Sequence, residues 1–389
     1  MNEITVGELF SGYGSQELAL KYSNISHKVL YTSDIDINAI LAYAIIRYDI
    51  TEKVDISDKE IIKFLNNRGI KVPKNISTNK LHMLYNSVKL TNNYGDISLI
   101  DANTVPYTDL LTYSFPCTQI SRAGTMAGMK EGSGTKSSLL HECKKIIKSK
   151  HNKYLLMENV SDLLSKKHID DFLDWCKWLE LEGYTNSYKV MKGSDYGVPQ
   201  NRQRVFMISI YNGDIFNFPE KRELNTYLQD LLEDNAAFEG NVLDIKNNPI
   251  YNYSNNTFNK SNIDLINIVN DEIRIKQAVK EGYSILQKFD KGSMCDLSYP
   301  TSKTRRGRVQ CDGKVCPTLT ASQQALYLIN DKYNIRKLTN REEFRLMGVN
   351  DYDIDKLLSL GLTYNEYHKL AGNSIITNCM VEIFNKLFK

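Results

Sequence analysis

The chain has 389 residues, of which 42% are hydrophobic and 24% are charged. This composition is typical of a soluble globular protein of two to three domain equivalents, and it excludes a mainly disordered chain. The net charge of +3 is too small to indicate a nucleic-acid partner by itself.

No apolar run reaches the roughly 18 residues that a membrane-spanning helix needs. The first residues lack the pattern of a secretory signal. The seven cysteines are scattered and form no C-x-x-C pair, which argues against a disulfide framework and a zinc site. We therefore expect a cytoplasmic protein with no membrane contact and no metal.

The first half of the chain alternates between short apolar runs and helical patterns. Strands are expected at residues 4–10, 29–32, 110–115, 154–157, 188–190 and 205–210, and helices at residues 18–22, 37–48, 138–147 and 169–179. This alternation predicts an α/β fold: a mostly parallel sheet with helices on both faces.

Two stretches interrupt the alternation. Residues 50–93 contain the capping box Ser57-x-x-Glu60, which predicts a helical insertion. Residues 212–328 are rich in asparagine and tyrosine and lack a clear period, so we interpret them as a smaller, irregular domain. A second capping box, Thr339-x-x-Glu342, and a helix at residues 375–388 follow. The predicted organisation is 1–211, 212–328 and a returning segment, 329–389.

The segment Phe10-Ser-Gly12-Tyr-Gly14 lies where a predicted strand turns into a helix. Glycines there permit a tight turn and close approach of a ligand to the backbone. Glu17 occupies the place of the third glycine of a dinucleotide fingerprint, which disfavours a pyrophosphate. Asp34 ends the second strand, where a carboxylate can accept hydrogen bonds from a ribose. The combination suggests a nucleoside-containing ligand without a pyrophosphate, such as S-adenosylmethionine, and an ordinary tight turn fits the segment equally well.

Pro116-Cys117 and Glu158 follow successive predicted strands, the usual place for chemistry in open α/β sheets. A glycine-studded loop between them has the composition of a lid. For each residue alone, the alternative is structural: a buried cysteine for Cys117 and a helix-capping glutamate for Glu158. The occurrence of both residues at neighbouring strand ends favours a reaction centre.

Two further polar patterns stand out. Gln200, Arg202 and Arg204 have period two and lead into a strand, so we expect them on one face, suited to an anionic or carbonyl-bearing ligand. Residues 303–314 hold five basic side chains against Asp312 alone. This run is suited to phosphate contacts, although its charge alone also fits a solvated turn.

Taken in order, these motifs resemble those of the DNA (cytosine-5) methyltransferases. The matching segments are 9–14, 114–121, 157–160, 195–204, 336–348 and 371–374. The resemblance implies the Rossmann-like sheet of S-adenosylmethionine-dependent methyltransferases, with a target-recognition domain at about 212–328. It also implies transfer of a methyl group from S-adenosylmethionine to C5 of a flipped-out cytosine in a specific duplex DNA sequence, of the restriction-modification type.

The resemblance assigns roles to the residues already singled out. Cys117 resembles the nucleophile that adds to C6 of cytosine, and Glu158 the residue that holds N3. Arg202 and Arg204 resemble the pair near the base carbonyl. The residues implied for the cofactor are Phe10, Gly12, Gly14, Asp34, Asp96, Ile97, Pro116, Leu139, Asn373 and Ile375, and those implied for DNA are Ser121, Gln200, Arg305, Arg306, Arg308 and Thr318.

The chain departs from the family pattern at two positions. Thr118 stands where glutamine usually follows the cysteine, which affects the expected loop contacts to DNA. Ile35 stands where the family often has an aromatic residue against the adenine ring.

The expected partner is double-stranded DNA, and the expected state of the protein is a monomer. A cognate restriction endonuclease that acts separately is a further candidate partner. The alternatives are the tRNA-methylating branch of the same family, a non-catalytic binding subunit and an NAD-dependent enzyme. The missing third glycine argues against the NAD-dependent enzyme.

Overall fold

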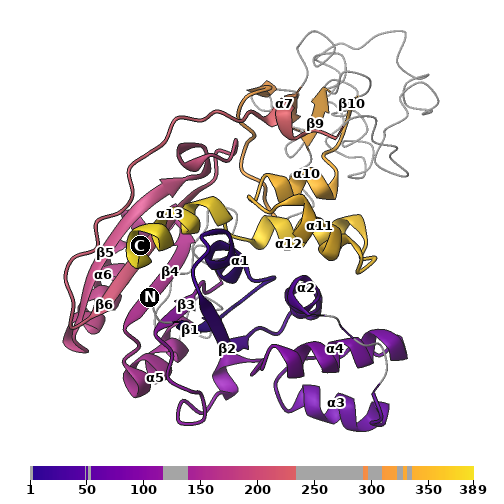
Figure 1. The fold of residues 1–389 in the computed structure, drawn as a ribbon, viewed down its shortest axis with the longest axis vertical. Coiled ribbons are helices and arrows are strands. Elements are labelled where there is room, and N and C mark those ends of the chain that lie inside the picture. Colours follow the sequence, from indigo (N-terminus) through magenta and orange to yellow (C-terminus); the bar gives the residue numbers. More distant parts are fainter. Residues whose placement is uncertain are drawn as a thin grey trace, which may run out of the picture.

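The structure is a computed structural model that describes residues 3–48, 50, 54–116, 139–233, 292–296, 309–321, 327–330 and 335–389 (Figure 1). Its described part contains a large sheet flanked by helices and a smaller sheet. The predicted nucleophile Cys117, its neighbour Thr118 and Ser121 lie outside the described residues, as do Arg305, Arg306 and Arg308.

The large sheet has six strands in the order β2-β1-β3-β4-β6-β5. The strands are β1 (Ile4–Leu9), β2 (His27–Ser33), β3 (Leu110–Tyr113), β4 (Tyr154–Val160), β5 (Tyr184–Lys192) and β6 (Gln203–Tyr211). The first four pair in parallel, whereas β6 is antiparallel to both β4 and β5. The sheet is therefore mostly parallel with an antiparallel edge, as the alternating sequence pattern predicts.

Helices cover both faces of this sheet. On one face, α1 (Ser15–Tyr22), α2 (Ile37–Arg47) and α13 (Thr377–Phe388) pack against side chains such as Val6, Leu110 and Phe206. On the other, α5 (Leu140–Lys150) and α6 (Ile169–Leu181) pack against Leu111 and Met157. Successive strand residues point to opposite faces, so one buried strand serves two cores. The predicted Rossmann-like α/β fold is confirmed.

The insertion forms two helices, α3 (Asp58–Asn66) and α4 (Thr78–Leu90), which lie side by side below α2 in Figure 1. The predicted capping box is present: the Ser57 side chain accepts from the Glu60 amide, and the Glu60 carboxylate accepts from the Ser57 amide. The pair shares a separate apolar core with Ile40 and Leu41 of α2. The insertion therefore docks on the helix that follows Asp34.

The smaller sheet has the order β10-β9-β7-β8 and is antiparallel. Its strands are β7 (Ser293–Asp296), β8 (Val309–Asp312), β9 (Tyr327–Asn330) and β10 (Ile335–Arg336), and α7 (Leu228–Leu231) lies beside it. The chain then returns to the large sheet through α10 (Asn340–Arg345), α11 (Asp351–Leu358) and α12 (Tyr364–Asn373). The capping box at Thr339 is confirmed at the start of α10.

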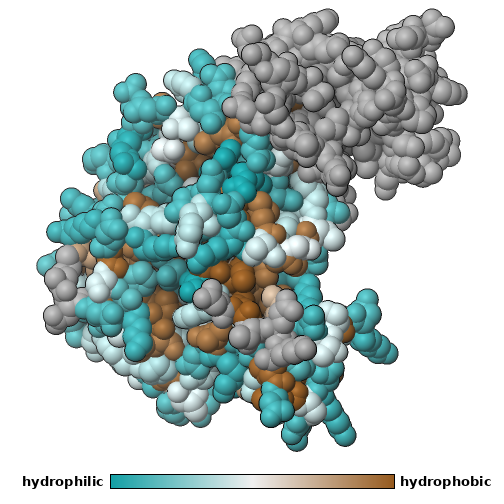
Figure 2. All heavy atoms as spheres, turned by 45° about the vertical axis from the view of Figure 1, so that its right-hand side comes forward, coloured by the Kyte–Doolittle hydropathy of each residue, from teal (hydrophilic) through white to brown (hydrophobic). Residues whose placement is uncertain are grey.

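The surface in Figure 2 is hydrophilic over much of the described area, with separate hydrophobic patches between the polar residues. Within the described ranges, no helix has both the length and the apolar character needed to cross a membrane.

Candidate active site

The carboxyl ends of four strands meet at one edge of the large sheet. Leu9 pairs with both Ser33 and Tyr113, and Tyr113 pairs with Met157. The polar residues that follow these four positions therefore start from neighbouring points. This register brings the glycine turn, Asp34, Pro116 and Glu158 to the same edge, where open α/β sheets bind ligands.

The glycine turn closes onto Asp34. Phe10 and Gly12 have positive φ angles of 56° and 55°, a left-handed conformation that is uncommon for a non-glycine residue. The Gly12 amide donates to Asp34 Oδ2 at 2.8 Å, and the Asp36 amide donates to Oδ1 at 2.8 Å. Burial raises the pKa of Asp34, and these amide bonds oppose the rise. A strained turn thus points its backbone at a partly buried carboxylate.

Asp96 and Ile97 follow a residue that is bonded to the end of β2, next to Asp34 in the chain. The Ser33 hydroxyl donates to the Gly95 carbonyl at 2.7 Å, which joins the end of β2 to the start of the short 3-10 helix η1 (Ile97–Leu99). Asp96 caps this helix, and its Oδ1 accepts from the Ser98 amide at 2.9 Å and the Ser98 hydroxyl at 2.7 Å. Ile97 is buried. Ile35, the residue without the expected aromatic ring, is 51% exposed.

The segment 373–375 reaches the same turn from the end of α12. The hydroxyl groups of Ser15 and Ser374 are 2.5 Å apart, so this segment touches the first residue of α1. Asn373 is exposed and Ile375 is buried. The structure therefore gathers residues far apart in the sequence around the glycine turn. Pro116 and Leu139, both partly buried, flank the segment that contains Cys117.

Near the end of β4 the buried Glu158 forms an ion pair with the partly buried Arg204. The Arg204 Nε lies 3.1 Å from Glu158 Oε1, and Glu158 is 7% exposed. Burial raises the pKa of Glu158, while Arg204, Arg202 and the Ser114 side chain act in the opposite direction. A carboxyl group with a raised pKa beside a fixed cation can hold or donate a proton to a ligand nitrogen.

Asn159 was not singled out from the sequence, yet it supports this edge. Its Nδ2 donates at 3.0 Å to the carbonyl of Phe115, two residues before Cys117. The side chain thereby ties the end of β4 to the backbone that leads into the predicted nucleophile. In the sequence, only the position of Asn159 directly after Glu158 could have indicated this supporting role.

The expectation that Gln200, Arg202 and Arg204 share one strand face is wrong, because β6 begins only at Gln203. Gln200 is fully buried, and its Nε2 donates to the Leu346 carbonyl at 2.6 Å while its Oε1 accepts from the Leu319 amide at 3.0 Å. These long-range bonds hold the residue in an irregular segment before the strand.

Arg202 is also buried and acts as a joint between distant segments. Its guanidinium donates to the carbonyls of Leu319 at 2.6 Å, Gly372 at 3.0 Å and Ser374 at 2.5 Å. The structure thus brings Arg204 to Glu158 but turns Arg202 toward the backbone of residues 319 and 372–374. Thr318 is partly buried, and its hydroxyl donates to the Asn201 carbonyl at 2.9 Å.

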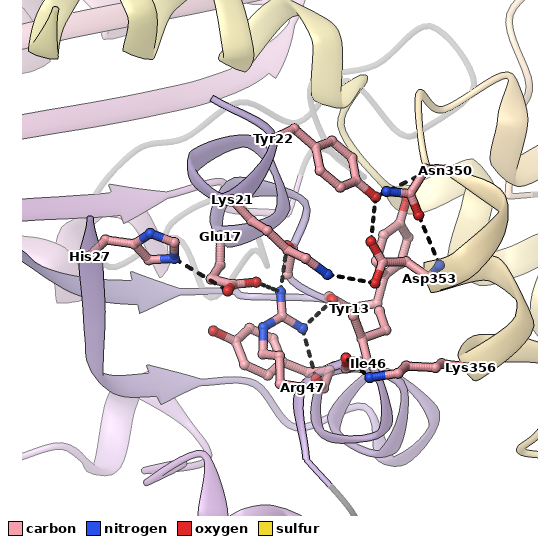
Figure 3. A network of polar contacts seen from close by, with 12 residues as sticks. Tyr13, Glu17, Lys21, Tyr22, His27, Ile46, Arg47, Asn350, Asp353 and Lys356 are labelled. Carbon is pink, nitrogen blue, oxygen red and sulfur yellow. Dashed lines mark hydrogen bonds and ion pairs between the residues drawn. The ribbon is translucent and has the colours of Figure 1, made fainter. Parts of the chain in front are cut away.

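A buried charge network lies under the glycine turn and was not predicted (Figure 3). Arg47 forms an ion pair with Glu17 and donates to the carbonyls of Gly14 at 2.9 Å and Tyr13 at 3.3 Å. Although burial opposes ionisation, Arg47 and His27 lower the pKa of Glu17 to about 2. The glutamate in place of the third glycine is therefore the counter-charge of an arginine that fixes the turn.

The described ranges contain no group of three or more His, Cys, Asp or Glu side chains placed to hold a metal ion. The polar groups at the sheet edge are suited to a nucleoside ligand and to a heterocycle whose ring nitrogen can accept a proton from Glu158.

Comparison with known proteins agrees with this chemistry. The sequence model of the family described as C-5 cytosine-specific DNA methylase matches residues 69–389. The chain is 37% identical to the type II methyltransferase M2.ScrFI of Lactococcus lactis subsp. cremoris, over 99% of both chains. It is 32% identical to the orphan methyltransferase M.SssI of Spiroplasma monobiae, covering 99% of this chain and 97% of that protein.

Solved structures share the fold. The Dnmt2 methyltransferase of S. pombe aligns with a TM-score of 0.56 at 16% identity, covering 98% of this chain and 97% of that one. The Entamoeba histolytica methyltransferase EhMeth aligns with a TM-score of 0.55 at 17% identity, covering 100% and 98%.

Proposed function

Because this chain belongs to the C-5 cytosine-specific DNA methylase family and is a DNA (cytosine-5) methyltransferase, we propose that it methylates a flipped-out cytosine through a covalent bond between Cys117 and C6. The observation that carries the proposal is the ion pair between the buried Glu158 and Arg204 near the end of β4. It lies one strand away from β3, which leads through Pro116 into Cys117.

S-adenosylmethionine is the proposed methyl donor, and its sulfonium supplies the methyl group when bound. The residues present fit such a ligand, since the turn at Phe10 and Gly12 exposes backbone beside the Asp34 carboxylate. Asp34 is placed to accept hydrogen bonds from ribose hydroxyls. Asp96 and Ile97 would meet the adenine, and Ile35 would offer an aliphatic surface in place of an aromatic one.

The proposed reaction begins when the Cys117 thiolate forms a bond to C6 of cytosine. Protonated Glu158, held by Arg204, donates its proton to N3, so that the electron pair of the C5–C6 double bond becomes available at C5. C5 would then take the methyl group as the bond between that methyl and the sulfonium breaks and leaves a thioether. A base removes the C5 proton, the C6–sulfur bond breaks to release the Cys117 thiolate and restore the aromatic ring, and N3 returns its proton to Glu158. Covalent addition is needed because C5 is barely nucleophilic in free cytosine.

The target carbon is inaccessible inside a stacked duplex, so the cytosine must leave the helix. We place the DNA between the catalytic part, 1–211 with 329–389, and the recognition part, 212–328. The basic run 303–314 belongs to the recognition part. Ser121, Thr318 and the three arginines 305, 306 and 308 remain the candidate DNA-side residues. Gln200, which was expected among them, is fully buried and bonded to the backbone at Leu346 and Leu319, so it would position the segment around it and not contact DNA itself.

The nucleophile can be tested directly. Wild-type protein should form a stable covalent adduct with duplex DNA containing 5-fluorocytosine. Fluorine replaces the C5 hydrogen, so the proton loss that normally releases the cysteine cannot occur. Cys117→Ala should lose both the adduct and methyl transfer while it still binds S-adenosylmethionine in isothermal titration. Retention of the adduct by Cys117→Ala would show that another cysteine attacks.

Bisulfite sequencing of DNA from cells that express the protein would identify the target sequence. A parallel assay on tRNA tests the alternative substrate. Methylation of tRNA but not DNA would overturn the proposed substrate.

A further inference from the structure

The helical insertion contacts the proposed adenine end of the cofactor site. The turn that leaves α3 passes next to Asp96, and the Asp96 amide donates to the Arg68 carbonyl at 2.7 Å. The backbone that precedes Ile97 is thus bonded to the insertion on one side. On the other side, the Gly95 carbonyl accepts from Ser33 at the end of β2.

The sequence builds this turn with a glycine motif at the end of α3. The Ile70 amide donates to the Leu65 carbonyl at 3.1 Å, and the Gly69 amide donates to the Asn66 carbonyl at 2.9 Å. This is the Schellman pattern, with Gly69 left-handed at φ 72°. Leu65 and Ile70 are both fully buried in the core that the insertion shares with α2. The position of the turn is therefore set by packing against the helix that follows Asp34.

The fit between the two backbones leaves no room for a side chain. A Cβ at Gly69 would lie 2.6 Å from Asp96 Cβ and 3.4 Å from Asp96 Oδ2. A Cβ at Gly95 would overlap the Arg68 carbonyl. Asp96 Oδ1 accepts both bonds from Ser98, and the Cβ and Oδ2 of Asp96 are the atoms that a side chain at Gly69 would meet, so such a side chain would displace the carboxylate.

We propose that the insertion 54–93 positions Asp96 for recognition of the adenine amino group of the cofactor, and that Gly69 is the positioning residue through which it acts. The inference rests on the proposed use of S-adenosylmethionine. A carboxylate accepts a hydrogen bond from the exocyclic amine of adenine and repels the carbonyl oxygen that replaces it in hypoxanthine. A displaced Asp96 therefore loses base discrimination as well as affinity.

Gly69→Ala is the test, and Gly361→Ala is the matched control. Gly361 has a similar φ of 62°, but a Cβ there would meet nothing within 4 Å, so the two variants share backbone strain and differ in the contact with Asp96. The probes are S-adenosylhomocysteine and S-inosylhomocysteine, measured by isothermal titration. Gly69→Ala should weaken the adenosyl probe about tenfold or more and bring the two affinities close together, whereas Gly361→Ala should leave both as in wild type.

The outcomes distinguish a failure of the inference about Gly69 from a failure of the proposed cofactor. If Gly69→Ala loses thermal stability as Gly361→Ala does but retains wild-type affinity and preference, the insertion is only a structural addition and the inference is overturned. If Gly69→Ala does not fold, Gly69→Asn takes its place, because asparagine tolerates the left-handed conformation and still carries the Cβ. If the wild-type protein binds neither probe, the proposed cofactor fails and the inference falls with it.

Discussion

Glu8 lies within β1, directly before the residue that leads into the glycine turn, and has no exposed surface. Its Oε2 accepts a hydrogen bond from the Tyr43 hydroxyl at 2.5 Å. Burial raises the pKa of Glu8 to about 7, although Arg47 and the Tyr43 bond act to lower it. A carboxyl group that resists ionisation thus lies close to the proposed cofactor site.

This pKa predicts a pH dependence of stability. The folded state binds more protons than the unfolded state between the ordinary value of 4.5 and the folded value of about 7. Stability contributed by protonated Glu8 is therefore present below pH 4.5 and is lost as the pH rises through 7, by about 3 kcal/mol in total. Glu8→Gln, which cannot ionise, should lack this loss. Urea unfolding of both proteins from pH 4.5 to 8 measures the difference, and parallel profiles would contradict the assignment.

Asp34 provides a second prediction at the scale of single residues. Asp34→Ala should weaken S-adenosylmethionine binding by about 1.5–3 kcal/mol, because a charged acceptor is lost and the Gly12 amide loses its partner. The neighbour Asp36 caps α2, so Asp36→Ala should cost about 1 kcal/mol of stability and leave binding intact. Isothermal titration compares the two. The reverse result would make Asp36 the ribose ligand.

At the scale of elements, local patterns account for much of what is observed. The capping boxes at Ser57 and Thr339 start helices as predicted, and the strand ends that carry Pro116 and Glu158 meet in register. Helices α11 and α12 were not predicted. In α12 the buried side combines Tyr367, Leu370 and Ala371 with His368, whose Nδ1 lies 2.6 Å from Glu343 Oε1, so a polar pair interrupts the apolar spacing that marks a helix in sequence.

Gln200 and Arg202 are held by partners that lie far away along the chain. Their period of two predicts strand, but their partners are carbonyls more than a hundred residues away along the chain, at Leu319, Leu346 and Gly372. No local pattern contains such partners. The Glu17–Arg47 pair was missed for the same reason, since its two members come from different helices.

The joint made by Arg202 predicts a large effect on stability. Arg202→Ala removes the donor shared by the carbonyls of Leu319, Gly372 and Ser374 and should destabilise the protein by about 3 kcal/mol. Arg222→Ala is the control, because its ion pair with Glu382 is half-exposed and should contribute less than about 1 kcal/mol. Denaturant unfolding compares the two variants. Equal losses would show that the Arg202 joint adds little to stability.

At the scale of the whole molecule, backbone hydrogen bonds anchor the end of the basic run. The Lys314 carbonyl accepts from the Leu228 amide at 2.8 Å. Two residues later, the Cys316 amide donates to the Pro199 carbonyl and the Asn201 amide donates to the Cys316 carbonyl, both at 2.7 Å. The chain that leaves the run is therefore held beside the segment that leads to Arg204, the ion-pair partner of Glu158. Positive charge near this anchor would lie close to DNA bound at the active site.

We predict that Arg305, Arg306 and Arg308 contact DNA, and two kinds of contact have different signatures. A lost phosphate contact should weaken binding to every sequence and reduce the salt slope by about 1. A lost guanine contact should cost about 1–3 kcal/mol on the target sequence alone. Single alanine variants are titrated on target and non-target duplexes at several salt concentrations. Lys74→Ala, in the helical insertion, is the control for the loss of one positive charge elsewhere. Unchanged affinity and slope for all three arginines would show that the run is a solvated loop, since a phosphate or a guanine contact must alter at least one of them.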